Sequence, residues 1–191
     1  MWGLSLRLPS RRASDWCIYG LPIMLPHLAR CRALEIPDWA IPHVVSQYTP
    51  TQLPALENLA VCASTDEEDE YAARWTTAVL QNASPTLTAL RWSGPHSEIL
   101  LQSQVQAWGQ LTALSLEMSV DPVVLCPVFR ALQRVTHLRM ANEWPEEHDP
   151  GMEVVQVPSV TTFVVVTTTS VLLRLKLPNL RRPIDLHCHR R

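Results

Sequence analysis

The sequence predicts an α/β solenoid of leucine-rich repeats, with one parallel sheet on the concave side and irregular helices and loops on the convex side. First, a pattern of the form Leu-x-x-Leu-x-Leu recurs, and its central position is occupied by Leu34, Leu59, Leu90, Leu114, Leu138 and Phe163. Second, these positions are separated by 25, 31, 24, 24 and 25 residues, and all steps but one fall in the range typical of leucine-rich repeats. Third, segments of about a dozen residues with helical spacing separate the units, which is the length that a parallel crossover needs.

Each unit is expected to contain one short strand. Apolar and other residues alternate with period two, as in Leu-Thr-Ala-Leu-Ser-Leu at 111–116, so the apolar side chains point to one face of the strand. One unit cannot bury that face alone, and neighbouring units therefore stack around a continuous core. The predicted strands are residues 33–36, 58–61, 89–92, 113–116, 137–140 and 162–166, and a looser seventh unit covers 177–186.

The crossovers in the first half of the chain are expected to be uneven. The apolar residues at 21, 25 and 28 have helical spacing, but the prolines among them limit any helix to a turn or two. A short helical turn is expected at 43–47. The longest crossover opens with Thr65-Asp-Glu-Glu68, an N-capping box, and an apolar stripe then predicts a helix over 66–81. Its acidic start fits either a solvated helix end or a docking patch for a basic partner.

The later crossovers carry clearer helix boundaries. Apolar residues with helical spacing predict a helix over 99–108, and Gly109 follows where a C-terminal cap is expected. The pair Asp121-Pro122 is typical of an N-cap followed by the first helical residue. The apolar face after it predicts a helix over 122–132, bent at Pro127.

A single domain accounts for the chain. Residues 1–20 lack a clear period and are expected to be an irregular leader or the truncated start of a longer protein. Residues 21–186 form an array of six to seven irregular units, interrupted by an acidic, turn-rich loop at 142–151, and residues 187–191 form a tail. Residues 1–14 carry three arginines and no acid, which also fits a transit peptide.

Composition argues against several functional classes. The chain has 191 residues, 47% hydrophobic and 18% charged, which is ordinary for a globular protein. Its net charge of −2 gives no basic excess for nucleic-acid binding. The five cysteines include no Cys-x-x-Cys pair, so neither a disulfide framework nor a zinc site is indicated, and a reducing compartment, the cytoplasm or the nucleus, is expected. No apolar run reaches the length of about 18 residues that a membrane helix needs, so no membrane partner is expected.

No pattern in the sequence is typical of an enzyme. No serine stands in a Gly-x-Ser-x-Gly elbow, and the five glycines form no phosphate-binding loop. The segment His187-Cys188-His189 offers three metal-capable side chains. Adjacent residues on an extended chain point alternately, however, and cannot supply a tetrahedral set alone. We therefore expect no catalytic residue, no cofactor and no metal.

The residues between the buried strand positions are the best candidates for a binding site, because they line the concave face that solenoids use for recognition. Arg91, Ser115 and Arg139 should lie in one row on that face, with Glu117 and His137 beside them. The two arginines would be about 10 Å apart, a spacing that suits an acidic or phosphorylated peptide. These five residues are the predicted site for a protein partner. The alternative is that Glu117 merely neutralises both arginines as exposed ion pairs.

Two segments, together with the repeats, resemble a known family. Residues 25–36, Leu-Pro-His-Leu-Ala-Arg-Cys-Arg-Ala-Leu-Glu-Ile, and 53–59, Leu-Pro-Ala-Leu-Glu-Asn-Leu, are similar to the region after the F-box in fungal F-box/leucine-rich-repeat proteins. The resemblance covers about residues 21–180 and implies non-catalytic substrate recognition for a cullin-type ubiquitin ligase. The F-box itself is absent, since Leu21-Pro22 matches only its opening and the acid is missing. Binding to the ligase adaptor is expected only if an F-box lies outside this chain.

Two other classes of protein stay open. A free-standing leucine-rich-repeat scaffold would bind a protein without any link to ubiquitin, and a longer gene model with an F-box before Met1 would favour the ligase role instead. A secreted, receptor-like repeat protein predicts a signal peptide and disulfide-capped ends, and the sequence has neither feature.

Overall fold

The fold is built on one parallel β-sheet. The computed structural model describes residues 4–8, 20–47, 53–63, 66–82, 86–94, 98–102, 106–118, 122–141, 154–166, 175–181 and 185–186. Eight strands pair in parallel in the order β1-β2-β3-β4-β5-β6-β8-β10. Their bounds are β1 (Leu4–Arg7), β2 (Cys31–Pro37), β3 (Asn58–Cys62), β4 (Ala89–Ser93), β5 (Ala113–Glu117), β6 (His137–Ala141), β8 (Thr162–Val165) and β10 (Asp185–Leu186). The expected α/β class with a parallel sheet is confirmed.

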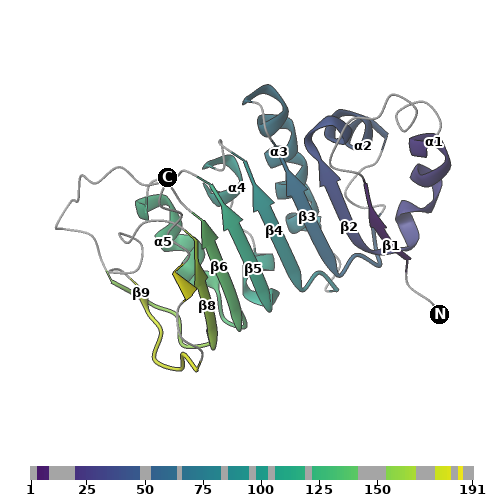
Figure 1. Cartoon of the computed structure of the whole chain (residues 1–191). Coiled ribbons are helices and arrows are strands. Elements are labelled where there is room, and N and C mark those ends of the chain that lie inside the picture. Colours follow the sequence, from purple (N-terminus) through teal and green to yellow (C-terminus); the bar gives the residue numbers. More distant parts are fainter. Residues whose placement is uncertain are drawn as a thin grey trace.

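Helical segments cover one face of this sheet and leave the other face open (Figure 1). Because the strands stand side by side in sequence order, each connection crosses over and adds the next strand beside the last. A separate two-stranded sheet pairs β7 (Val155–Gln156) with β9 (Leu175–Lys176). The helical segments are α1 (Leu21–Met24), η2 (Leu25–Arg30), η3 (Asp38–Ala40), α2 (Ile41–Gln47), α3 (Asp66–Asn82), α4 (Glu98–Gln102), η5 (Gln106–Gln110) and α5 (Pro122–Ala131).

The core lies between the sheet and the helical layer. Two rows of apolar side chains cross the strands on the covered face, and all of them are at most 3% exposed. Burial of each large side chain contributes about 1.5–3 kcal/mol relative to exposure, so the rows fix both the register and the face of β2 to β6 and β8. The rows are Leu34, Leu59, Leu90, Leu114, Leu138 and Phe163, and Ile36, Val61, Trp92, Leu116, Met140 and Val165.

A ladder of threonine hydroxyls joins neighbouring strands just before they start. Thr112 Oγ1 donates to the carbonyl of Thr88 at 3.2 Å, Thr136 to Thr112 at 3.2 Å, and Thr161 to Thr136 at 3.2 Å. Thr88 begins the series by donating to the carbonyl of Glu57 at 3.3 Å. Backbone N–H groups bond to the same carbonyls, for example Thr112 N to Thr88 O at 2.7 Å. The ladder therefore ties successive repeats at one end of the sheet, and the leucine pattern alone does not predict it.

The strands match the sequence-based expectation closely. The five predicted strands between residues 33 and 140 are present, each longer by one to three residues, and the sixth ends at Val165 instead of residue 166. The seventh unit contributes the short strand β10, beside β8.

The expectation of irregular structure at residues 1–20 needs correction. Residues Leu4–Arg7 form β1, which pairs in parallel with β2. Leu6 and Leu8 are buried and extend the core. The physical signal was the alternation of Leu4, Leu6 and Leu8, which is enough for a strand although the full leucine pattern is missing.

The helix predicted over 99–108 is also wrong in part. Described residues there form two short pieces, α4 and the 3-10 helix η5. Gly109 lies inside η5 without a positive φ angle, so it is not a left-handed cap. A 3-10 turn is tighter than an α-helical one and suits a connector that must return quickly to the sheet.

The remaining helices agree with the sequence. Helices α2 and α3 cover the turns expected at 43–47 and 66–81, and α5 contains Pro127 in its interior, as expected. Several features fall outside the described residues. They are the capping residues Thr65 and Asp121, the loop at 142–151 and the tail at 187–191.

Candidate functional site

The open face of the sheet carries a groove of about 440 Å³ that crosses β1 to β6 and β8. It exists because the side chains that point away from the core are often small. Four alanines, on the face opposite the core leucines, form its floor. These alanines are Ala33, Ala60, Ala89 and Ala113. An apolar floor with a few polar groups above it is the usual composition of a binding site.

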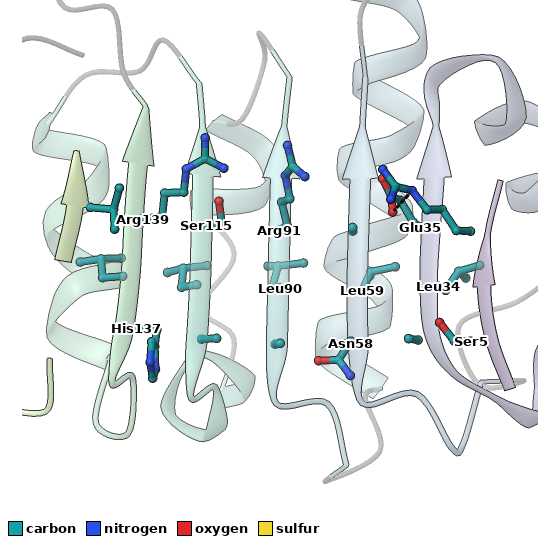
Figure 2. Close-up of a pocket in the computed structure, with 18 of the residues that line it drawn as sticks. Ser5, Leu34, Glu35, Asn58, Leu59, Leu90, Arg91, Ser115, His137 and Arg139 are labelled. Atoms are coloured by element: carbon teal, nitrogen blue, oxygen red, sulfur yellow. Dashed lines mark ion pairs between the residues drawn. The ribbon is translucent and has the colours of Figure 1, made fainter. Parts of the chain in front are cut away.

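The five residues predicted for partner binding lie together on this face. Arg91, Ser115 and Arg139 are register partners on β4, β5 and β6, so they form one row across the sheet, as Figure 2 shows. His137 is two residues before Arg139 on β6 and lies nearer the start of the strands. Glu117 is two residues after Ser115 on β5, on the same face. The predicted placement is confirmed, whereas the predicted role stays a prediction.

Glu117 links the two arginines. Its Oε1 lies 2.8 Å from Arg139 Nη1 and 3.2 Å from Arg91 Nη2, and Arg91 Nη2 also lies 3.5 Å from its second oxygen. The side chains of Arg91 and Arg139 are 43% and 41% exposed, and that of Glu117 is 21% exposed. Such exposed pairs contribute only about 0–1 kcal/mol to stability. The neutralisation by Glu117 that the sequence suggested is thus present, but one carboxylate balances only one of the two guanidinium charges.

Ser115 lies between the two arginines in the same row. Its hydroxyl oxygen is shielded from solvent and has no hydrogen-bond partner among the described residues. A buried hydroxyl without a partner costs about 1–3 kcal/mol of desolvation free energy. The row therefore holds a hydroxyl that is both unpartnered within the described residues and covered by its neighbours.

His137 is exposed on the other side of the groove. Its Nδ1 lies 2.9 Å from Thr136 Oγ1, so the threonine of the ladder fixes the orientation of the ring. Asn58 lies in the same row on β3, also near the start of its strand (Figure 2). This row combines the two polar side chains with Ala33, Ala89 and Ala113 and carries no carboxylate among its described lining residues.

Two more ion pairs lie at the N-terminal end of the sheet. Arg7 Nε is 2.9 Å from Glu35 Oε2, and Arg32 Nη1 is 3.3 Å from Glu57 Oε1. Arg7 and Glu35 line the groove. This pair was not predicted, because residues 4–7 were not expected to form a strand. Each of these two arginines has a carboxylate of its own, in contrast to the pair that shares Glu117.

Features that would indicate chemistry are sparse. Within the described ranges, no three His, Cys, Asp or Glu side chains come together as a metal site. The His187-Cys188-His189 segment is not among those residues. Burial raises the pKa of the Cys31 thiol, and Cys31 Sγ lies 3.7 Å from the carbonyl oxygen of His27. A nucleophile or metal ligand needs the thiolate, so Cys31 is a core residue.

No helix in the described part of the chain is long and apolar enough to cross a membrane. Comparisons with protein-family models, with curated proteins and with solved structures find no match to this chain.

Proposed function

We propose that the chain is a leucine-rich-repeat solenoid that binds an extended segment of a protein partner in the sheet groove. The observation that carries this proposal is the groove itself, which crosses seven strands over an alanine floor. Parallel strands are about 4.8 Å apart, so the groove is about 29 Å long. An extended chain advances about 3.3 Å per residue, so roughly nine residues would span it.

The regular repeat supports the solenoid assignment. The core leucines of β2 to β6 stand in exact register with one another, and the threonine ladder links consecutive units at nearly constant sequence spacing. Each strand therefore contacts only its neighbours in a continuous core, as in other repeat arrays. Arrays of this kind present one extended face for binding.

The cellular role proposed from the resemblance is substrate recognition for a cullin-type ubiquitin ligase in the cytoplasm or nucleus. The adaptor would be a partner only through an F-box outside this chain. The alternative is a free-standing scaffold that binds a protein without ubiquitin. Co-purification of the natural full-length gene product with the ligase adaptor favours the first role, and its absence favours the second.

Binding in the groove is tested by selecting binders to the full chain from a displayed library of random peptides of about nine residues, the length that spans the groove. Arg91→Ala and Arg139→Ala should each weaken the selected peptides about tenfold, since a hydrogen bond to a charged group is worth about 1.5–3 kcal/mol. Thermal unfolding should change little, because exposed side chains rarely alter stability by more than about 0.5 kcal/mol.

The matched control is Arg74→Ala. Arg74 is also exposed and paired with a glutamate, Glu70, but it lies on α3 in the helical layer, away from the groove. This variant should bind the selected peptides as the unchanged protein does. A folded Arg91/Arg139 double variant with unaltered binding would place recognition elsewhere, and a library that yields no binder would contradict the proposed function.

A further inference from the structure

The shared carboxylate suggests which partner chemistry the groove accepts. We propose that the groove selects a segment with one acidic side chain, Asp or Glu, next to an apolar residue, and that Glu117 discriminates against phosphorylated segments. This inference rests on the proposed function and specifies its ligand. It concerns three side chains in particular, Arg91, Glu117 and Arg139.

The charge of the cluster formed by Arg91, Glu117 and Arg139 favours a carboxylate over a phosphate. Both guanidinium groups contact one oxygen, Glu117 Oε1, so the cluster holds two positive charges and one negative charge. One further carboxylate makes the cluster neutral. A phosphate group carries about −1.5 to −2 charges at neutral pH and would leave the cluster negative. Like charges placed against each other in an interface are unfavourable, so Glu117 penalises the phosphate more than the carboxylate.

The position of Glu117 keeps its carboxylate next to any anion that both arginines bind. An anion that reaches both Arg91 and Arg139 must lie over β5, the strand that stands between β4 and β6 and carries Glu117. It cannot avoid the fixed carboxylate. The guanidinium fork offers five donors, and Glu117 uses only the outer nitrogens Nη1 of Arg139 and Nη2 of Arg91. Within the described part of the chain, donors therefore remain for a second carboxylate on each arginine.

The floor of the groove favours an apolar residue beside the acidic one. Ala89 and Ala113 lie two residues before Arg91 and Ser115 on β4 and β5, about 6.6 Å away along the strand. Both alanines line the groove. Their small side chains leave space above an apolar surface beside the arginines. When the acidic side chain of a segment contacts the arginines, a neighbouring residue of that segment lies over this floor. An apolar side chain at that position buries more apolar surface than a polar one would.

The test uses the selected peptide and two synthetic versions of it, in which the acidic residue is replaced by glutamine or by phosphoserine. Affinities for the full chain are measured by fluorescence polarisation. The unchanged protein should bind the acidic peptide on the order of tenfold more tightly than either version. The Glu117→Gln substitution should raise the affinity for the phosphoserine peptide by about tenfold or more. This increase should be larger than the increase in affinity for the acidic peptide.

Glu70→Gln is the matched control, because it removes a carboxylate paired with one arginine outside the groove. It should change none of the three affinities. Three results would overturn this inference. The selected peptides could lack an acidic residue, or the phosphoserine peptide could bind the unchanged protein more tightly than the acidic one. The affinities for both peptides could also rise equally in Glu117→Gln. If the peptides selected from the library still lose affinity for Arg91→Ala, the proposed function stands even though the inference on acidic partners fails. If no peptide binds the unchanged protein, both fail.

Discussion

At the scale of single residues, the role of each side chain is decided by the face of the sheet on which it lies. Leu114 is 2% exposed and packs in the core between Leu90 and Leu138, its register partners. Ser115, the next residue, points to the opposite face and lines the groove. Stability and recognition are therefore carried by alternate positions of the same strand.

Leu114→Ala should lower the free energy of unfolding by about 2–5 kcal/mol, because it leaves a cavity between two neighbouring repeats. Denaturant titration of the full chain measures the loss. Ile23→Ala is the control, since the side chain of Ile23 is 69% exposed and its removal should cost less than about 0.5 kcal/mol. A loss below about 1 kcal/mol for Leu114→Ala would mean that the leucine rows do not carry the core.

The candidate site was predictable as a set of positions but not as a set of contacts. Period-two alternation and equal repeat spacing are enough to place Arg91, Ser115 and Arg139 in one row. The sharing of Glu117 by both arginines depends on side-chain rotamers, which no spacing specifies. The unpartnered hydroxyl of Ser115 depends in the same way on the atoms that cover it.

At the scale of elements, strands were easier to predict than crossovers. Burial on one face of a strand leaves a period of two in the sequence, whereas a crossover only has to return the chain to the sheet. The division of the crossover before β5 into α4 and η5 has no counterpart in its apolar spacing. The strand β1 was not predicted because residues 1–20 as a whole lack a clear period, although residues 4–8 alternate locally.

The threonine ladder makes a testable contribution at this scale. Thr112→Val keeps the shape of the side chain but removes the hydroxyl that donates to Thr88. It should lower the free energy of unfolding by about 0.5–1.5 kcal/mol, toward the low end because this hydrogen bond is exposed to solvent. Thr112→Ser keeps the donor and should lose less in the same denaturant titration. If serine and valine variants are equally stable, the hydroxyl does not hold the repeats together.

At the scale of the whole molecule, the sheet has a centre and two ends. The core forms one cluster that extends from Leu6 on β1 to Val165 on β8. Strands β2 to β6 and β8 have a partner on each side, whereas β1 and β10 pair with one strand each within the described sheet. If the chain is the proposed repeat array, its stability comes from contacts between nearest neighbours, so the central strands should be the most stable part of the sheet.

Hydrogen exchange should reveal this gradient in the full chain. Backbone amides of β4 and β5 should exchange slowest, because both strands are flanked by buried rows, and those of β1 and β10 should exchange fastest among the sheet strands. Leu114→Ala should speed exchange most in β5 and its neighbours β4 and β6, since each repeat contacts only the adjacent ones. If Leu114→Ala speeds exchange equally in all strands, the domain opens as one cooperative unit. If the central and the end strands of the unchanged protein are equally protected from exchange, the nearest-neighbour description is contradicted.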